Sequence, residues 1–306
     1  MKSLVSIVCI TYNHEPYLRK ALDGFLMQET NFPYEIILAE DCSTDGTRQI
    51  CEEYKAKYPD RITYISRDYN VGGVGNERRA IAAARGKYLA FCEGDDYWID
   101  PLKLQKQVDF MESHPDYSVC FTRYNKSFKS TGKGSRGAAD ALFIGKEDAD
   151  YITLSMDTAM NLWCTQYLTL LCRRDCYDNT WYKRYKYFRD THQVYHLMCQ
   201  GKCAILNFVG GVYCITGNGE HSSKDYFFQE QMTLAVDTEL WKVNKDDRWK
   251  SLCRRVMQDM IDRGCDGDRR VTIGDRMVMM KYAWRLLWMT GGIGKFFKNI
   301  DKIIRL

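Results

Sequence analysis

Residues 87–98 read KYLAFCEGDDYW, an apolar run followed at once by three carboxylates, Glu93, Asp95 and Asp96. Like charges this close raise one another's pKa values and cost stability unless a positive charge lies among them. A divalent cation is the simplest such charge, because Mg²⁺ and Mn²⁺ prefer hard carboxylate oxygens. The stretch therefore predicts a buried strand that carries a metal site at its end.

Three further pairs of strand and helix precede this stretch. Short apolar runs at 4–12, 34–41 and 61–66 have the length of buried strands, and apolar residues at helical spacing follow at 13–28, 43–58 and 76–86. Pro16 suits a first helical turn, and Ser43 or Thr44 suits the N-cap of the second helix. Apolar strands that alternate with helices predict an α/β fold, a Rossmann-like, mostly parallel sheet flanked by helices.

Polar residues gather where these strands are expected to end. Ligands of open parallel sheets bind beyond the carboxyl ends of the strands. Those ends carry Thr11, Tyr12, Asn13, Glu40, Asp41, Arg67, Asp68, Asn70, Glu93, Asp95 and Asp96. The sequence thus predicts one polar crevice shared by four strands.

The second half of the chain is less regular. It predicts a helix at 102–113, a strand at 117–122, a mobile loop at 126–140, a strand at 164–173, a helix at 188–201 and a strand pair at 203–216 broken at Gly210 and Gly211. From about residue 224 the pattern is helical. We expect residues 1–222 to form the catalytic domain and residues 223–306 a helical extension.

Composition narrows the class of protein. The net charge of +4 over 306 residues is too small and dispersed to indicate nucleic acid as the main partner. There is no apolar stretch of membrane-spanning length and no cleavage site after the N-terminal run, so a cytoplasmic location is expected. The 13 cysteines include no CxxC and mostly lie in apolar runs, which favours reduced core thiols over zinc ligands.

The last 26 residues, KYAWRLLWMTGGIGKFFKNIDKIIRL (281–306), mix aromatic and aliphatic side chains with Lys and Arg. A basic amphipathic helix of this kind can lie in a membrane interface. It can equally be a helix packed on the catalytic domain. Both interpretations stay open, and GGIG argues against one continuous helix.

Several motifs together resemble one family. VSIVCITYNHEPYLRKAL (5–22), ILAEDCSTDGT (37–47), NVGG (70–73) and ARGKYLAFCEGDDYWIDPLKLQKQ (84–107) occur in the order and spacing of family 2 glycosyltransferases, which use nucleotide sugars and have the GT-A fold. The resemblance is strong over residues 3–120 and weak over 160–222. Several motifs at the correct mutual distance are more specific than any single glycine pattern.

The resemblance implies a nucleotide site and a metal site. Nucleotide contacts map to Thr11, Tyr12, Asn13, Glu15, Asp41, Asn70, Gly72, Arg79 and Asp95, with Asp41 as the acceptor for a base N–H. CEGDDYW corresponds to the DxD element of the family, with Glu93 in place of the usual first Asp. Asp96 and Glu93 would then hold Mn²⁺ or Mg²⁺. Helix capping is the plainer interpretation of the EDCSTDGT acids.

An inverting transferase also needs a general base for the acceptor hydroxyl. The family places an Asp or Glu at the start of a later helix, and Asp190 occupies the equivalent position. His192 is the second candidate because its ordinary pKa lies nearer neutrality. Either residue could instead simply cap the helix.

One feature departs from the family pattern. Related enzymes often carry Arg and His near the donor phosphates where this chain has Cys214 and Thr216, and His221 is a candidate substitute.

The resemblance implies inverting transfer of a sugar, from a UDP-sugar, to a hydroxyl of a glycan or lipid-linked acceptor in bacterial-type surface polysaccharide synthesis. We expect the acceptor to be bordered by the 126–140 loop and by NLWCTQ (161–166). The altered residues keep a second hypothesis open, a non-catalytic nucleotide-sugar-binding protein. A Rossmann oxidoreductase fails on its glycine spacing.

Overall fold

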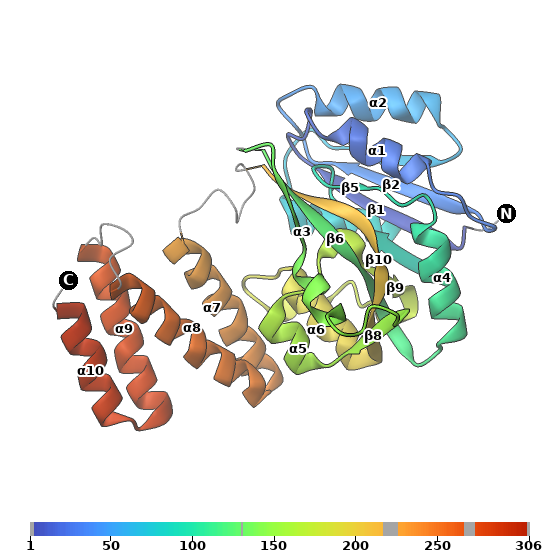
Figure 1. Ribbon diagram of the computed structural model, residues 1–306. Coiled ribbons are helices and arrows are strands. Elements are labelled where there is room, and N and C mark those ends of the chain that lie inside the picture. Colours follow the sequence, from blue (N-terminus) through green and yellow to red (C-terminus); the bar gives the residue numbers. More distant parts are fainter. Residues whose placement is uncertain (1–2, 130, 217–225, 266–272, 305–306) are drawn as a thin grey trace. The chain divides into compact units, whose positions relative to one another are not determined.

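The structure, a computed structural model, describes residues 3–129, 131–216, 226–265 and 273–304. Contacts divide the chain into two units (Figure 1). The α/β unit consists of Met1–Lys183 with Phe188–Gly217, and the helical unit consists of Arg184–Tyr187 with Asn218–Leu306. Each unit has its own hydrophobic core.

Four parallel strands form one half of the central sheet. They are β1 (Val5–Thr11), β2 (Tyr34–Glu40), β3 (Ile62–Ile65) and β4 (Tyr88–Phe91), in the spatial order β3-β2-β1-β4. Every residue of β1, β2 and β4 except Ile10 is buried, which is why these strands read as continuous apolar runs. The predicted parallel α/β core is confirmed.

Helices cover both faces of this sheet. Apolar residues of α1 (Leu18–Leu26), α2 (Thr47–Lys57) and α4 (Lys103–Ser113) pack on one face, and those of α3 (Gly73–Ala83) and α6 (Asp190–Gln200) pack on the other. The predicted N-cap of α2 is wrong. Gly46 holds that position, because Ser43 and Thr44 are bonded to Asn13 instead.

The other half of the sheet is mixed. The order continues from β4 through β9 (Leu171–Arg173), β6 (Tyr117–Phe128), β10 (Lys202–Ile215) and β5 (Tyr97–Trp98), while β7 (Gly134–Arg136) pairs with β6 and β8 (Tyr151–Leu154) with β10. Strands β6 and β10 are parallel, and the other pairings in this half are antiparallel. The shorter elements are α5 (Met156–Leu162) and four 3₁₀ helices, Ala138–Phe143, Tyr167–Thr169, Arg174–Cys176 and Trp181–Arg184.

Three predictions for this half are wrong in detail. The expected loop at 126–140 begins as strand, because β6 continues to Phe128 and pairs with β7. The expected strand at 164–173 is strand only over Leu171–Arg173. The expected strand pair at 203–216 is the single strand β10, which passes Gly210 and Gly211 through register shifts rather than a turn.

The helical unit consists of α7 (Tyr226–Asn244), α8 (Asp247–Cys265), α9 (Ile273–Thr290) and α10 (Ile293–Ile304). Each helix packs on its neighbour in sequence, and apolar residues of all four form the core of this unit. Within the described ranges, the helices lack the length and apolar character needed to cross a bilayer. The cysteines of the described residues are free thiols, and most are buried.

Candidate active site

The ends of β1, β2 and β4 are brought together around Gly94. Its N–H donates to the carbonyl of Ile10 at 3.0 Å, and the N–H of Asp41 donates to the carbonyl of Thr11 at 3.1 Å. A Cβ at position 94 would lie 2.6 Å from Thr11 Oγ1 and 3.0 Å from His14 Nδ1. Only glycine allows this approach, so the turn after β4 can close against the end of β1.

The three carboxylates of the motif lie in different environments. Glu93 is exposed, Asp95 is half-buried, and Asp96 is only 4% exposed. Oδ1 of Asp96 accepts a hydrogen bond of 2.7 Å from the N–H of Cys214 on β10. Burial and then the charge of Asp95 raise the pKa of Asp96 well above its ordinary value. Full ionisation of the cluster is therefore costly, as the spacing of its acids predicted.

Buried polar atoms next to this cluster have no hydrogen-bond partner among the described residues. They are Oδ1 of Asp95, Oγ1 of Thr11 and Nδ1 of His14. The other carboxylate oxygen of Asp95 lies 3.8 Å from Nε2 of His14. Unsatisfied buried polar atoms cost free energy, so these three are suited to contact a ligand, an ion or water.

These residues fit a hard divalent cation. No group of three His, Cys, Asp or Glu side chains in the described ranges converges as a ready-made metal cage. Mg²⁺-type sites, however, often use one or two carboxylates and take further oxygens from a substrate's phosphates. The high pKa of Asp96 and the unpartnered oxygen of Asp95 both indicate a place where positive charge is missing.

Asn13 and Glu15 hold the loop before α2. Oδ1 of Asn13 accepts the N–H of Thr44 at 2.8 Å, and Oε2 of Glu15 accepts the N–H of Gly46 at 3.0 Å. Asn13 has a φ of 54°, a left-handed conformation that Asn tolerates better than most residues. These two predicted nucleotide contacts thus shape the loop beside the strand ends. Tyr12, which lies between the end of β1 and Asn13, is 42% exposed.

Asp41 joins this loop to the segment before α3. Its Oδ1 accepts the N–H of Val71 at 2.9 Å, and its backbone carbonyl accepts a bond of 3.0 Å from Nδ2 of Asn70. Oδ1 of Asn70 in turn accepts the N–H of Gly72 at 2.9 Å. Gly72 has a φ of 77°, which favours glycine at this position. The predicted residues Asp41, Asn70 and Gly72 therefore lie together.

Arg79 is held on α3 by local bonds. Its guanidinium donates to the carbonyl of Ser66 at 3.1 Å and to Oδ1 of Asn76 at 3.4 Å. Burial, and then the nearby charge of Arg67, lower its pKa from the ordinary value. This predicted nucleotide contact thus lies next to the end of the third strand, with its charge partly buried.

Asp190 is the first residue of α6, as predicted, and its Oδ1 accepts the N–H of Thr191 at 2.8 Å. Asp190 and the acidic cluster both act on the pKa of the same phenol, that of Tyr213 on β10. Burial raises the pKa of Tyr213, and the charges that raise it further belong to Asp96, Asp95, Glu93 and Asp190. The predicted base and the predicted metal motif are therefore both near enough to Tyr213 for their charges to raise its pKa.

His192 is a poor candidate for the base. Its side chain is fully buried, and Nδ1 accepts the N–H of Arg189 at 3.1 Å. Burial, followed by the nearby His196, lowers its pKa to about 3. An imidazole that is neutral and turned into the helix start serves as a cap rather than as a proton acceptor.

The departures from the family pattern lie at the end of β10. Cys214 serves the site through its backbone N–H, which any residue except proline would supply. Thr216 follows the end of β10 at Ile215. His221, the suggested substitute, lies outside the described residues.

The sequence did not reveal a buried network between α3 and α6. The hydroxyl of Tyr167 lies 2.6 Å from Oε2 of Glu77 and 2.5 Å from Oε1 of Gln193, and Gln193 Nε2 donates to Glu77 Oε1. Burial raises the pKa of Glu77 to about 7. Gln193 lies one turn after Asp190, so the network fixes the helix that carries the candidate base. No motif marks these residues.

A buried lysine beneath the motif was also missed. Nζ of Lys103 lies 3.9 Å from the ring centroid of Trp98 and donates to Gln107 at 2.7 Å. Burial lowers its pKa to about 7. Its place in an amphipathic helix gives no sign of this burial. His14 likewise carries no motif of its own, since it stands between Asn13 and Glu15 in the stretch that resembles the family.

Comparison with known proteins gives a family match. The family model "Glycosyl transferase family 2" matches residues 6–209. An uncharacterized protein of Mycobacterium tuberculosis is 50% identical over 131 residues, which cover 43% of this chain and 38% of that protein. The putative teichuronic acid biosynthesis glycosyltransferase TuaG of Bacillus subtilis is 37% identical over 124 residues, 40% of this chain and 48% of TuaG. The chain thus matches less than half the length of these relatives.

Solved structures share the fold. Residues 1–349 of TarS from S. aureus, in complex with UDP-GlcNAc, give a TM-score of 0.61 at 17% identity and cover 94% of this chain and 81% of that one. The mannosyltransferase PcManGT from Pyrobaculum calidifontis, in complex with GDP-Man and Mn²⁺, gives 0.58 at 13% identity, with 99% and 86% covered. The predicted GT-A-like fold with C-terminal helices is confirmed.

Proposed function

Because the chain belongs to glycosyl transferase family 2, we propose that it transfers a sugar from a UDP-sugar to a hydroxyl of a glycan or lipid-linked acceptor, with inversion. The product would be a bacterial-type surface polysaccharide. A UDP donor is supported by the UDP-GlcNAc complex of TarS, and a surface polymer by the likeness to TuaG. We assign catalysis to residues 1–222 and a helical extension to 223–306.

The donor would lie at the strand ends. We assign its nucleotide to Thr11, Tyr12, Asn13, Glu15, Asp41, Asn70, Gly72, Arg79 and Asp95. Support comes from the hydrogen bonds that tie Asn13 and Glu15 to the loop before α2 and from those that join Asp41 to Asn70 and Val71. The ring of Tyr12, which is partly exposed, would stack on the base.

Asp96 and Glu93 would hold Mn²⁺ or Mg²⁺, which supplies positive charge beside the leaving diphosphate when bound. The chain's own part is to keep these oxygens in place. The N–H of Cys214 fixes Oδ1 of Asp96, and the fit of Asp95 and Asp96 to a missing positive charge supports the assignment. PcManGT, which shares the fold, is known with Mn²⁺.

Asp190 would accept the proton of the acceptor hydroxyl as that oxygen attacks the anomeric carbon. This role is supported by the charge of Asp190, which raises the pKa of Tyr213 beyond the effect of burial, together with the charges of Asp96, Asp95 and Glu93. The observation that carries the whole proposal is the geometry of the motif, where buried oxygens of Asp95 and Thr11 lack a partner from any residue that the structure describes and lie beside Asp96, which the N–H of Cys214 holds.

The deciding experiment incubates the chain with a panel of UDP- and GDP-sugars and Mn²⁺ and measures nucleotide release with and without candidate acceptors. Acceptor-dependent release of UDP supports the proposal. Tight binding of a UDP-sugar without any release would favour the alternative, a non-catalytic nucleotide-sugar-binding protein. That alternative is supported by Cys214 and Thr216, which stand where related enzymes often carry Arg and His.

We further place the protein in the cytoplasm, at the inner face of the membrane, where a lipid-linked acceptor would be met. The support is the aromatic and basic composition of the C-terminal helices.

A further inference from the structure

Helices α9 and α10 already have a packed side. Met279, Ala283 and Leu286 of α9 and Phe296 and Ile303 of α10 are buried in the core of the helical unit. The two helices lie side by side and are joined at Gly291 and Gly292 (Figure 1). Their stability within this unit therefore does not depend on covering their other side.

That other side exposes large apolar side chains. Met277, Trp284 and Trp288 of α9 are 70%, 60% and 82% exposed, and Phe297 of α10 is 64% exposed. Spacings of seven and four residues put the three α9 side chains on one side of the helix. The rings of Trp284 and Phe296 are 4.5 Å apart, and those of Phe296 and Phe297 are 5.4 Å apart. We name Met277, Trp284, Trp288 and Phe297 the aromatic face.

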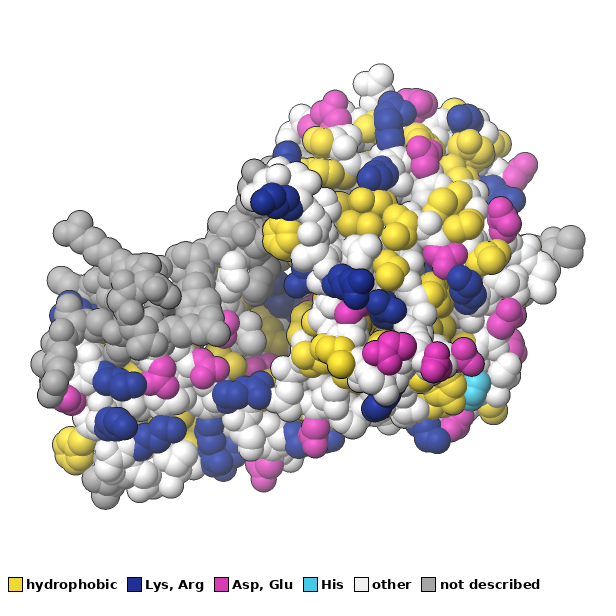
Figure 2. Space-filling model, in the orientation of Figure 1, with side chains coloured by type: hydrophobic (Ala, Val, Ile, Leu, Met, Phe, Trp, Pro, Cys, Tyr) yellow, Lys and Arg dark blue, Asp and Glu magenta, His cyan; other side chains and the backbone are white. Residues whose placement is uncertain are grey.

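Positive charge accompanies this face. The two helices carry two acidic residues, Asp275 and Asp301, against six basic ones, Arg276, Lys281, Arg285, Lys295, Lys298 and Lys302. Figure 2 shows Lys and Arg side chains interspersed with Asp and Glu on the visible surface of the helical unit. Exposed Trp and Phe among Lys and Arg are typical of helices that lie in the headgroup region of an anionic bilayer.

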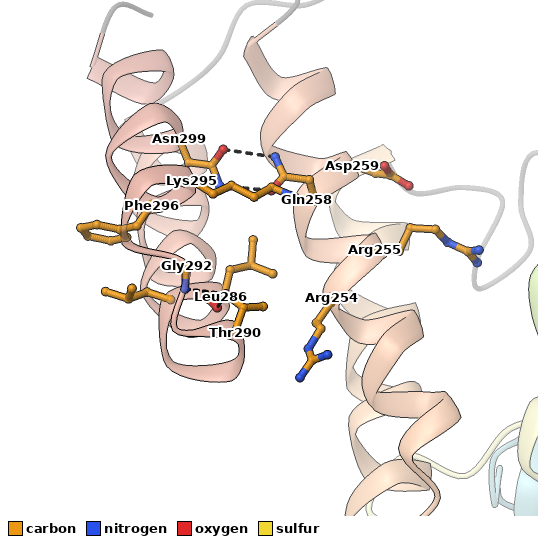
Figure 3. A pocket seen from close by; sticks show the side chains of 11 residues that line it. Arg254, Arg255, Gln258, Asp259, Leu286, Thr290, Gly292, Lys295, Phe296 and Asn299 are labelled. Atoms are coloured by element: carbon orange, nitrogen blue, oxygen red, sulfur yellow. Dashed lines mark hydrogen bonds between the residues drawn. The ribbon is translucent and has the colours of Figure 1, made fainter.

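A pocket of about 290 Å³ lies between α8 and the other two helices (Figure 3), and its lining includes Phe296, whose ring contacts Trp284 of the aromatic face. Its charged lining residues are three cations, Arg254, Arg255 and Lys295, and one acid, Asp259, and Leu286, Leu287 and Phe296 supply its apolar side. Arg254 extends toward the turn between α9 and α10, where it donates to the carbonyl of Met289 at 2.8 Å. Its Nε is buried and has no hydrogen-bond partner in the described part of the chain. A cationic pocket with an apolar wall suits a phosphate attached to an apolar chain.

We propose that the aromatic face binds the surface of an anionic phospholipid membrane and that the adjoining pocket receives a headgroup phosphate. Trp284, Trp288 and Phe297 would enter the interface, and the lysines would attract the anionic lipid. The membrane contact rests on the proposed function, because it would bring the transferase to its lipid-linked acceptor. The binding itself is a property of the helical unit.

The test uses the full chain and sedimentation with vesicles of phosphatidylcholine, with or without phosphatidylglycerol. We expect binding to anionic vesicles to be at least about tenfold tighter than to neutral ones and to weaken as salt rises. Trp288→Ser combined with Lys298→Gln should reduce binding about tenfold or more. The matched control, Ile144→Ser with Lys146→Gln, removes an apolar side chain that is 78% exposed and a neighbouring exposed lysine from the α/β unit and should bind as the parent does.

A second arm tests the pocket. Arg254→Gln and, separately, Lys295→Gln should each weaken binding to anionic vesicles severalfold, and thermal unfolding of both variants shows whether the fold is kept. Millimolar inorganic phosphate should not displace the protein, because the free ion lacks the apolar part of the ligand.

Equal binding to neutral and anionic vesicles, or equal loss in the control, would overturn the proposal. The proposal would also be overturned if the parent bound no vesicles and the Trp288 variant changed its oligomeric state. A second copy of the chain would then be the partner that covers the aromatic face. UDP binding is measured on the same variants and should be unchanged, because the aromatic face belongs to the helical unit and the candidate active site to the α/β unit. A loss of vesicle binding can therefore be told apart from a failure of the proposed function.

Discussion

The backbone N–H of Cys214 donates a hydrogen bond of 2.7 Å to Oδ1 of Asp96, a residue 118 positions earlier in the chain. The strand β10 therefore fixes the most buried acid of the motif through an atom that carries no side-chain identity. The pKa of that acid is raised by burial and by Asp95, so its charged form is costly in the free protein.

Asp96→Asn should exchange activity for stability. The folded chain holds the proton of Asp96 more tightly than the unfolded chain does, so the stability contributed by the protonated form is lost as pH rises above the ordinary carboxyl range. Asn keeps an oxygen for Cys214 but never ionises. At pH 8 without metal, we expect the free energy of unfolding of Asp96→Asn to be about 1 to 3 kcal/mol higher than that of the parent. The rate of sugar transfer should fall by about a thousandfold or more.

Thermal unfolding with and without Mn²⁺ and UDP measures this effect. The ligands should raise the melting temperature of the parent and leave that of Asp96→Asn nearly unchanged. Asp116→Asn, which removes an acid half exposed and paired with Lys202 at 2.7 Å, is the control and should preserve activity. A fully active Asp96→Asn would contradict the metal assignment.

Asp190→Asn should stop chemistry and spare binding. If Asp190 is the general base, kcat falls by about a hundredfold to ten-thousandfold, while the Kd for UDP stays within about twofold. Asp247→Asn is a matched control, because Asp247 is likewise the first residue of a helix, α8. Transfer rates and UDP titration calorimetry on both variants provide the comparison. Normal transfer by Asp190→Asn would show that the base lies elsewhere.

Gly94→Ala should damage the site by steric conflict. The added Cβ would meet Thr11 Oγ1 at 2.6 Å, so the turn after β4 must move away from β1. We expect a loss of about 1 to 3 kcal/mol in stability and at least about tenfold weaker UDP binding. Gly294→Ala on α10 is the control, since no atom lies within 4 Å of its added Cβ. Unchanged UDP binding by Gly94→Ala would argue against a donor site at this turn.

Glu77→Gln should remove a pH dependence of stability. The pKa of Glu77 is about 7 in the folded chain, above its ordinary value of 4.5, so its contribution is complete below that ordinary value and is lost as pH rises through 7. The parent should lose about 2.5 kcal/mol of stability between pH 5 and 8 from this group. Gln imitates the protonated carboxyl toward Tyr167 and Gln193 and should flatten that slope.

Denaturant unfolding at several pH values measures the slope. Glu52→Gln, an exposed carboxylate on α2, is the control and should retain the parent's dependence. An unchanged slope in Glu77→Gln would mean that the fold does not raise the pKa of Glu77.

The sequence predicted the parts of the fold and site that depend on runs of neighbouring residues. The apolar runs that end at Thr11, Glu40 and Phe91 predicted three parallel strands, and the acids after the last of them marked the motif. These features are local, because burial on both faces of a strand leaves a continuous apolar record.

Features that depend on the backbone or on distant partners left no such record. The N–H of Cys214 is available at every non-proline residue, so nothing marked it as the partner of Asp96. Glu77 follows an asparagine in an ordinary helix and reads as a solvated acid, although Tyr167 and Gln193 bury it. β10 read as two strands because two glycines usually signal a turn, whereas here they absorb register shifts along β6.

Helix α6 ends at Gln200 and β10 begins at Lys202, so one uninterrupted segment of 190–215 carries Asp190 at its start and the partner of Asp96 at its end. For protein engineering this stretch is a fixed spacer. An affinity tag, a split site or a new chain terminus inserted within it would uncouple the two ends, and such changes belong elsewhere in the molecule.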